Sequence, residues 1–138
     1  PESAALLAAC LEEDWPRLNG RVKFIEGDLE EVPVHRDDLI VSVHACGGLT
    51  DVVLDRAQAV KARVAVLPCC HDLTGEDLAG LQGWLAGPLA MDVVRATRLR
   101  WKGYRVYTQE IPKDITPKNR LLLAEPIESS REERLPKP

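Results

Sequence analysis

The feature that most constrains the fold is a strand-helix-strand pattern in the middle of the chain. Leu39–Val43 is a nearly continuous apolar run, Thr50–Ala62 carries apolar residues at helical spacing, and Arg63–Leu67 is a second apolar run. Apolar runs of this kind are typical of strands with both faces covered. Because such units are almost always right-handed and parallel, both strands are expected to end at the same edge of one sheet.

The segments around this unit continue the alternation. Ser3–Glu13 has the spacing of a helix, and Arg21–Glu26 is predicted as a short strand. Farther along, Thr74–Trp84 and Leu89–Lys102 are predicted as two further helices. Helices and strands that alternate with short connections indicate an α/β sheet with helices on its faces.

The C-terminal part predicts a different pairing. Tyr104–Ile111 and Asn119–Glu125 are strand-like, and the link 112–118 between them is too short for a helical crossover. We therefore expect parallel strands followed by an antiparallel strand pair, in one domain that spans residues 1–128. Ser129–Pro138 is charged and poor in apolar residues, which is typical of a disordered tail.

Composition excludes some functions and compartments. The chain has 138 residues, four cysteines and a net charge of -4, with no apolar run near the roughly 18 residues that a membrane helix needs. With no signal peptide visible, we expect reduced thiols in a cytoplasmic protein. The charge gives no footprint for nucleic acid, so that such binding would come from a longer parent protein. The first residue is Pro1, which favours such a parent.

Chemistry concentrates where the two central strands end. His44-Ala-Cys46-Gly-Gly follows the first strand and Pro68-Cys-Cys-His71 follows the second. Ligands bind at the carboxyl edge of open α/β sheets. Packing and helix capping are the alternative explanation for these residues, and packing alone explains Cys10. The pattern predicts a catalytic pocket formed by His44, Cys46, Cys69, Cys70 and His71.

This group of residues is consistent with two kinds of site. Thiolates and imidazoles are the ligands that zinc prefers, but adjacent cysteines seldom both ligate one metal and paired C-x-x-C motifs are absent. We therefore assign no metal ligands from the sequence and keep zinc as the less favoured alternative. A Cys/His nucleophile is the other alternative, although no oxyanion-hole motif or third orienting residue is identifiable.

The two segments also resemble a known family. His44-Ala-Cys-Gly-Gly-Leu-Thr-Asp51 and Leu67-Pro-Cys-Cys-His71 are similar to the H-A-C-G-x-x-T-D and P-C-C signatures of a methyltransferase-like family. That family includes a domain of proteins that carry a glutathione-transferase C-terminal domain, and related bacterial proteins. The resemblance continues through Thr116-Pro-Lys-Asn-Arg120 and covers the chain from about Arg21 to Pro126. It implies the C-terminal part of a Rossmann-like, class I methyltransferase that uses S-adenosylmethionine.

The resemblance also implies residue roles. It places Gly27, Asp28 and Leu29 at the end of the third strand of the methyltransferase fold, where an acidic side chain contacts the adenine of the cofactor. A solvated aspartate that caps a turn is the alternative for Asp28. The segment that begins at His44 falls beside the transferred methyl group, and His44 or His71 would serve as a base.

One departure from the family limits what the chain can do alone. The glycine-rich turn that holds the methionine part of the cofactor is not visible, and Gly47-Gly48 lacks the required spacing. We expect an incomplete sheet whose exposed edge is covered by a missing N-terminal half or by a partner chain. The sequence leaves two functions open: a methyltransferase acting on RNA or protein, and a non-catalytic scaffold or Cys/His metal-binding module.

Overall fold

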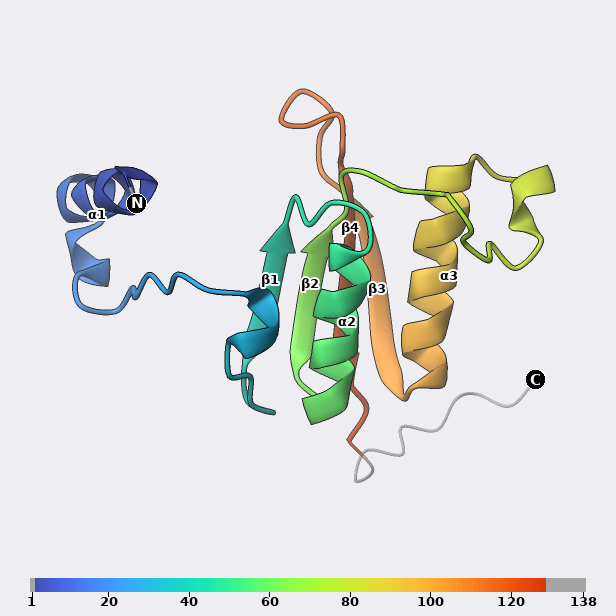
Figure 1. Cartoon of the computed structure of the whole chain (residues 1–138), viewed down its shortest axis with the longest axis horizontal. Coiled ribbons are helices and arrows are strands. Elements are labelled where there is room, and N and C mark those ends of the chain that lie inside the picture. Colours follow the sequence, from blue (N-terminus) through green and yellow to red (C-terminus); the bar gives the residue numbers. More distant parts are fainter. Residues whose placement is uncertain (1, 129–138) are drawn as a thin grey trace. The chain divides into compact units, whose positions relative to one another are not determined.

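The chain divides into two compact units. We examined a computed structural model that describes residues 2–128, so the predicted tail at 129–138 lies outside the described residues. The first unit ends at Val32 and the second begins at Pro33. Both appear in Figure 1, and each is described by itself.

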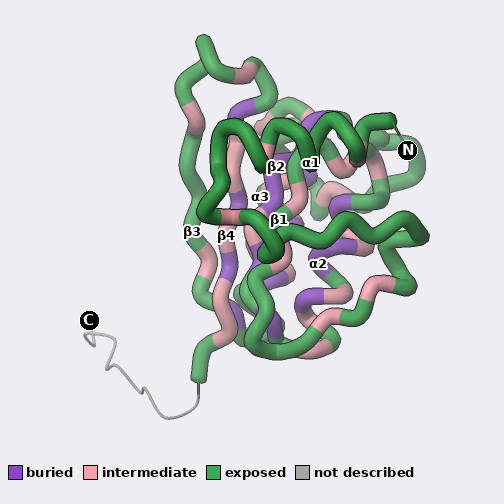
Figure 2. Tube along the Cα trace, turned by 90° about the vertical axis from the view of Figure 1, so that its left-hand side faces the viewer, coloured by how far each residue is buried: buried purple, intermediate pink, exposed green. Residues whose placement is uncertain are grey.

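The first unit contains one α-helix and two short 3₁₀ turns. Helix α1 spans Glu2–Asp14 and confirms the helix predicted over Ser3–Glu13. The turns η1 and η2 follow at Pro16–Leu18 and Leu29–Glu31. None of these three elements has a buried side chain, and most of α1 is exposed (Figure 2). Cys10 is exposed on α1, so the expectation that packing explains this cysteine is wrong.

The strand predicted over Arg21–Glu26 is wrong. These residues form no strand, and Phe24 and Ile25 remain more than half exposed. A strand is stabilised by hydrogen bonds to a neighbour, and no strand among the described residues pairs with this segment. The segment has the apolar pattern of a strand, but the described residues offer no strand for it to pair with.

The second unit is built on a four-stranded mixed sheet. Strands β1 and β2 are parallel and in register, and they confirm the two central strands at their predicted bounds. Strand β4 is antiparallel to both β2 and β3, which confirms the predicted C-terminal pair. The fold class is therefore α/β, with strand order β1-β2-β4-β3. The strands span Leu39–Val43 (β1), Arg63–Leu67 (β2), Tyr104–Glu110 (β3) and Arg120–Pro126 (β4).

Two helices pack on one face of this sheet. Helix α2 spans Leu49–Val60 and ends where Lys61 adopts a left-handed conformation. Helix α3 spans Gly87–Trp101 and has Pro88 in its first turn, where proline is well accommodated. Both confirm predicted helices, and Figure 1 shows them beside the strands. No helix among the described residues has the length and apolar content to cross a bilayer.

The helix predicted over Thr74–Trp84 is wrong. The segment forms turns and one short 3₁₀ element, η3, at Leu81–Gly83. Its glycines at 75 and 80 and Ala79 all have positive φ, which interrupts an α-helix. The apolar spacing in this segment was therefore not helical.

The core lies between the two helices and the sheet. It joins side chains of α2, β2, α3, β3 and β4, and Figure 2 shows the buried segments among the strands and helices. The Tyr104 hydroxyl donates to the carbonyls of Ala57 and Ala62, which ties β3 to the end of α2. Burial raises the pKa of Tyr104. The core residues are Val53, Leu54, Ala57, Val64, Val66, Leu99, Tyr104, Leu122 and Ala124.

The opposite face of the sheet carries apolar side chains that the described helices do not cover. Leu39, Val41 and Val43 of β1 are each more than half exposed. Register places Val41 opposite Ala65 on β2, so the apolar surface continues across the parallel pair. Strand β1 also pairs on one side only among the described strands, so it forms one edge of the sheet.

Candidate functional site

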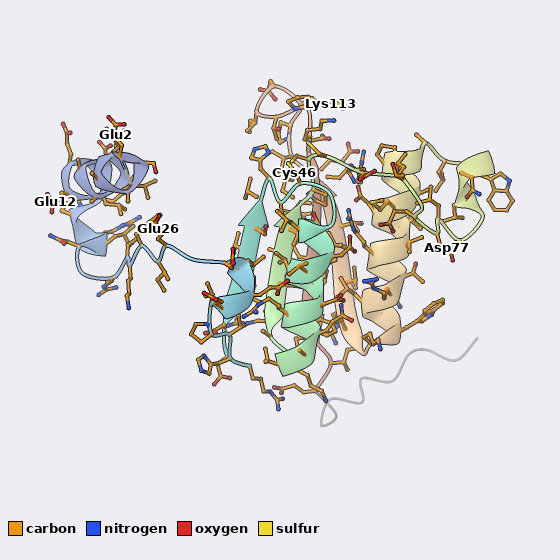
Figure 3. All side chains as sticks on the ribbon, in the orientation of Figure 1. Glu2, Glu12, Glu26, Cys46, Asp77 and Lys113 are labelled. Atoms are coloured by element: carbon orange, nitrogen blue, oxygen red, sulfur yellow. The ribbon has the colours of Figure 1, made fainter. Side chains whose placement is uncertain are left out.

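The loops that follow β1 and β2 lie side by side at the carboxyl edge of the sheet. Parallel register pairs Val43 with Leu67, so both loops begin at the same level. The backbone N–H of Gly47 then donates to the carbonyl of Cys70, with N and O 3.0 Å apart. Figure 3 shows Cys46 beyond the ends of these strands. The predicted convergence of the two segments is confirmed.

The backbone of the first loop explains why these residue types occur there. His44 and Gly47 both have positive φ, which turns the chain sharply between β1 and α2. The buried Thr50 hydroxyl donates to the Ala45 carbonyl at 2.7 Å and fixes the loop against the start of α2. The turn places Cys46 opposite the second loop.

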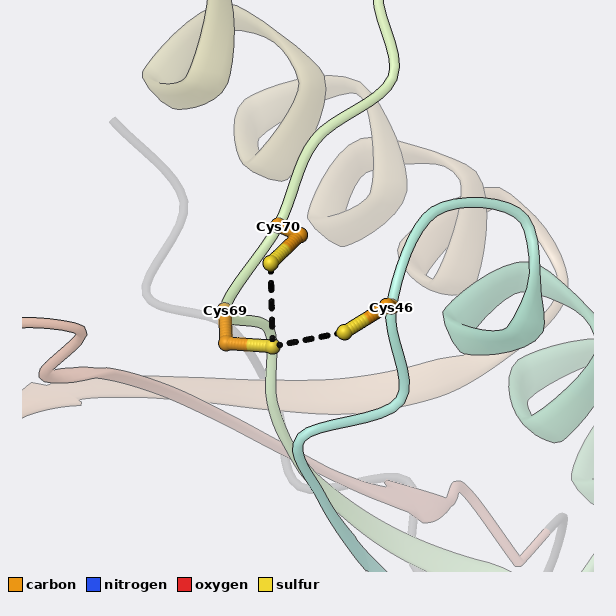
Figure 4. A group of neighbouring side chains, drawn as sticks. All are labelled: Cys46, Cys69 and Cys70. Carbon is orange, nitrogen blue, oxygen red and sulfur yellow. Dashed lines mark hydrogen bonds between the residues drawn. The ribbon is translucent and has the colours of Figure 1, made fainter.

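Three thiols meet between the loops. The sulphur of Cys69 lies 3.3 Å from that of Cys46 and 3.6 Å from that of Cys70. All three sulphurs lie within 4.8 Å of one another (Figure 4). Cys69 is buried, whereas Cys46 and Cys70 are exposed. The group thus has a buried centre and two members that solvent reaches.

The thiols change one another's acidity. The hydrogen bond with Cys69 raises the pKa of Cys46 to about 12, with a further contribution from Cys70. The pKa of Cys69 is lowered to about 7, first by its hydrogen bond with Cys46 and then by one with His44. Cys69 is therefore the thiol that ionises first, ahead of Cys46.

The two predicted imidazoles have different surroundings. His44 is next to the thiols, since its carbonyl accepts a hydrogen bond from the Cys46 sulphur at 3.5 Å and His44 helps to lower the pKa of Cys69. His71 has a buried side chain, 4% exposed, and its Nε2 lies 2.7 Å from a carboxylate oxygen of Asp92 on α3. Within the described residues, the three-sulphur group does not include His71. The structure thus joins His44 to the thiols and places the His71 ring nitrogen against α3.

A partly buried ion-pair network beside the site was not predicted from the sequence. Asp92 pairs with His71, Arg95 and Arg120, the last at 2.7 Å. Arg95 is 3% exposed, and its Nε lies 3.2 Å from both carboxylate oxygens of Asp51. A signal was present, because Asp51 closes the first motif and Asp92 and Arg95 share one face of a predicted helix.

The predicted cofactor residues belong to the first unit. Gly27, Asp28 and Leu29 are exposed, and Asp28 precedes η2 without a hydrogen bond from its side chain to that turn. Its carbonyl accepts the Glu31 N–H at 3.0 Å. The three thiols belong to the second unit.

A pocket of about 330 Å³ lies beside the second loop. Pro68, the residue before Cys69, forms part of its wall, and Asp92 and Arg120 supply charge. Its surface is mainly apolar, as ligand pockets usually are. The other lining residues come from α3, β3 and β4: Leu89, Val93, Ala96, Thr108, Gln109, Glu110, Leu121 and Leu122.

Comparisons of the chain with protein families, with curated proteins and with solved structures find no match. No relative therefore assigns a role to any of these residues. Function is inferred from the chemistry of the two loops and from the signatures that they resemble.

Proposed function

We propose that this chain is the C-terminal part of an S-adenosylmethionine-dependent methyltransferase domain with a Rossmann-like sheet. One observation carries the proposal. The two loops that resemble the family signatures meet at the carboxyl edge of parallel neighbours, linked through Gly47 and Cys70. Open α/β folds bind their ligands at this edge. The parallel pair followed by an antiparallel pair agrees with the same resemblance.

The described residues fit only one side of a cofactor site. The sequence lacks a glycine-rich turn for the methionine part, and Gly27–Leu29 lie in the first unit. We therefore derive no catalytic step through S-adenosylmethionine. In this proposal a missing N-terminal half or a partner chain supplies the rest of the site and covers the free edge of β1.

Within this proposal His44 is the general base. A base needs a ring nitrogen free to accept a proton from the methyl acceptor, and His44 is exposed beside Cys69. His71 is already engaged by Asp92 in a buried pair, so it positions the second loop. The acceptor would be an RNA or protein group that reaches the exposed side of the loops.

Calorimetric titration with S-adenosylmethionine tests the proposal. We expect binding by the product of the complete gene and none by residues 1–138 alone, because the glycine-rich turn lies elsewhere. In the complete product, Asp28→Ala should weaken binding about tenfold through loss of a hydrogen bond from the cofactor to a charged group. Glu26→Ala, also exposed and acidic, is the matched control and should leave affinity unchanged.

Absence of cofactor binding by a folded complete product would overturn the proposal. It would favour the scaffold or metal-binding alternative. Circular dichroism on the same samples establishes that the proteins are folded.

A further inference from the structure

The group of three thiols has no role in the methyl transfer proposed above. Methyl transfer needs an aligned acceptor and a base, and His44 supplies the base. Cys46, Cys69 and Cys70 nevertheless converge from two loops onto one point. Three sulphurs that converge in this way can act together as metal ligands.

We propose that Cys46, Cys69 and Cys70 bind one Zn²⁺ ion through three thiolates. The fourth coordination position faces solvent, because Cys46 and Cys70 are both exposed. Zinc with three protein ligands and one open position is the arrangement of catalytic sites, whereas structural sites have four protein ligands. This site does not depend on the proposed methyltransferase activity.

The distances between the sulphurs agree with this geometry. Zinc–sulphur bonds of about 2.3 Å in a tetrahedron separate neighbouring sulphurs by about 3.8 Å. The Cys69 sulphur lies 3.3 and 3.6 Å from those of Cys46 and Cys70, and no pair exceeds 4.8 Å. Shifts of the sulphurs of about 1 Å or less therefore suffice to place an ion between them.

Adjacency of Cys69 and Cys70 argued against zinc at the level of sequence. Neighbours in an extended strand point to opposite faces, which would separate their sulphurs. Here the two cysteines follow the end of β2, and Figure 4 shows the Cys69 sulphur directed toward Cys46 and the Cys70 sulphur directed toward that of Cys69. The objection does not hold for this loop.

The backbone holds the ligands in place without the ion. Gly47, next to Cys46, donates its N–H to the carbonyl of Cys70. This hydrogen bond links the two loops that carry the ligands. The guanidinium of Arg95 approaches the Gly47 carbonyl at 3.5 Å and braces the same turn from α3. A preformed set of ligands loses less conformational entropy on binding.

Titration of the reduced, metal-free protein with Co²⁺ tests the site. Co²⁺ reports thiolate ligands through charge-transfer absorption and tetrahedral geometry through its visible bands. We expect one Co²⁺ per chain, displaced by Zn²⁺, with protons released because the thiols must ionise. Binding should therefore weaken as the pH falls.

Serine variants identify the ligands. Cys46→Ser, Cys69→Ser and Cys70→Ser should each weaken Zn²⁺ binding more than about 100-fold, beyond the usual effect of an outer partner. Cys10→Ser is the matched control, since Cys10 is an exposed free thiol in the other unit. Its affinity should equal that of the native chain.

The proposal fails if the folded native chain gives no thiolate absorption with Co²⁺. It also fails if any of the three site variants, shown to be folded by circular dichroism, binds as tightly as Cys10→Ser. These results are independent of cofactor binding, so the metal site and the methyltransferase proposal are tested separately.

Discussion

At the scale of single residues, Arg95 connects helix α3 to both loops of the site. Its side chain is almost fully buried and pairs with Asp51 and Asp92. Asp51 opens α2 after the first loop, and Asp92 also pairs with His71 of the second loop. The two carboxylates offset the cost of burying the Arg95 charge, and removal of one member of such a group leaves the others uncompensated.

Substitution of Arg95 should therefore be costly. Arg95→Met leaves the carboxylates of Asp51 and Asp92 without their shared cation, and we expect it to lower the free energy of unfolding by about 3 kcal/mol. Arg98→Met is the control, because Arg98 also pairs with Asp51 but its side chain is 42% exposed. That variant should cost less than about 1 kcal/mol. Urea denaturation measures both, and equal losses would contradict the role given to Arg95.

Residue contacts were predictable only where strand topology determined them. The approach of Cys46 to Cys69 followed from two parallel strands ending at one edge. The pairing of His71 with Asp92 did not, because it depends on where α3 lies against the loops. Sequence periodicity indicates which face of a helix is apolar, but it does not indicate which distant side chain that helix will meet.

At the scale of elements, β1 separates a covered face of the sheet from an uncovered one. Ile40 packs against the core beneath the helices. Its neighbour Val41 points to the other face and is 63% exposed. Adjacent residues of one strand thus have different surroundings, as strand geometry requires.

This difference gives a matched pair of substitutions. Ile40→Thr places a hydroxyl against the core and should cost about 1–2 kcal/mol. Val41→Thr keeps a β-branched side chain on an exposed position and should cost less than about 0.5 kcal/mol. Chemical denaturation compares the two. An equal loss at Val41 would mean that another part of the protein covers this face.

The elements were predicted well where the apolar pattern was long or had a partner. Strands β1 and β2 occur at their predicted bounds. Their apolar side chains Ile40, Val64 and Val66 belong to or pack against the core that includes α2. The segment 21–26 has a similar apolar pattern but no partner strand among the described residues. The segment 74–84 is interrupted by left-handed glycines, whose conformation depends on surroundings that composition alone does not reveal.

At the scale of the whole molecule, all fully buried described residues belong to the second unit. They extend from Thr50 to Ala124, whereas the first unit ends at Val32. The second unit therefore has a core of its own.

Removal of residues 1–32 should leave this core intact. We expect a chain that begins at Pro33 to unfold cooperatively with a midpoint within about 2 °C of the native value, a shift worth less than 1 kcal/mol. Thermal circular dichroism measures the midpoint. A large drop, or loss of cooperativity, would show that the first unit contributes to the stability of the second.

The strand order determines when the sheet can close during synthesis. Strand β4 lies between β2 and β3, although it is the last of the four to leave the ribosome. Until Arg120–Pro126 emerges, β3 has no neighbour and one edge of β2 is unpaired. Unpaired strand edges are where nascent chains aggregate or bind chaperones. A chain truncated before Arg120 should therefore hold an open, chaperone-accessible sheet, which the seven residues of β4 complete once they are available.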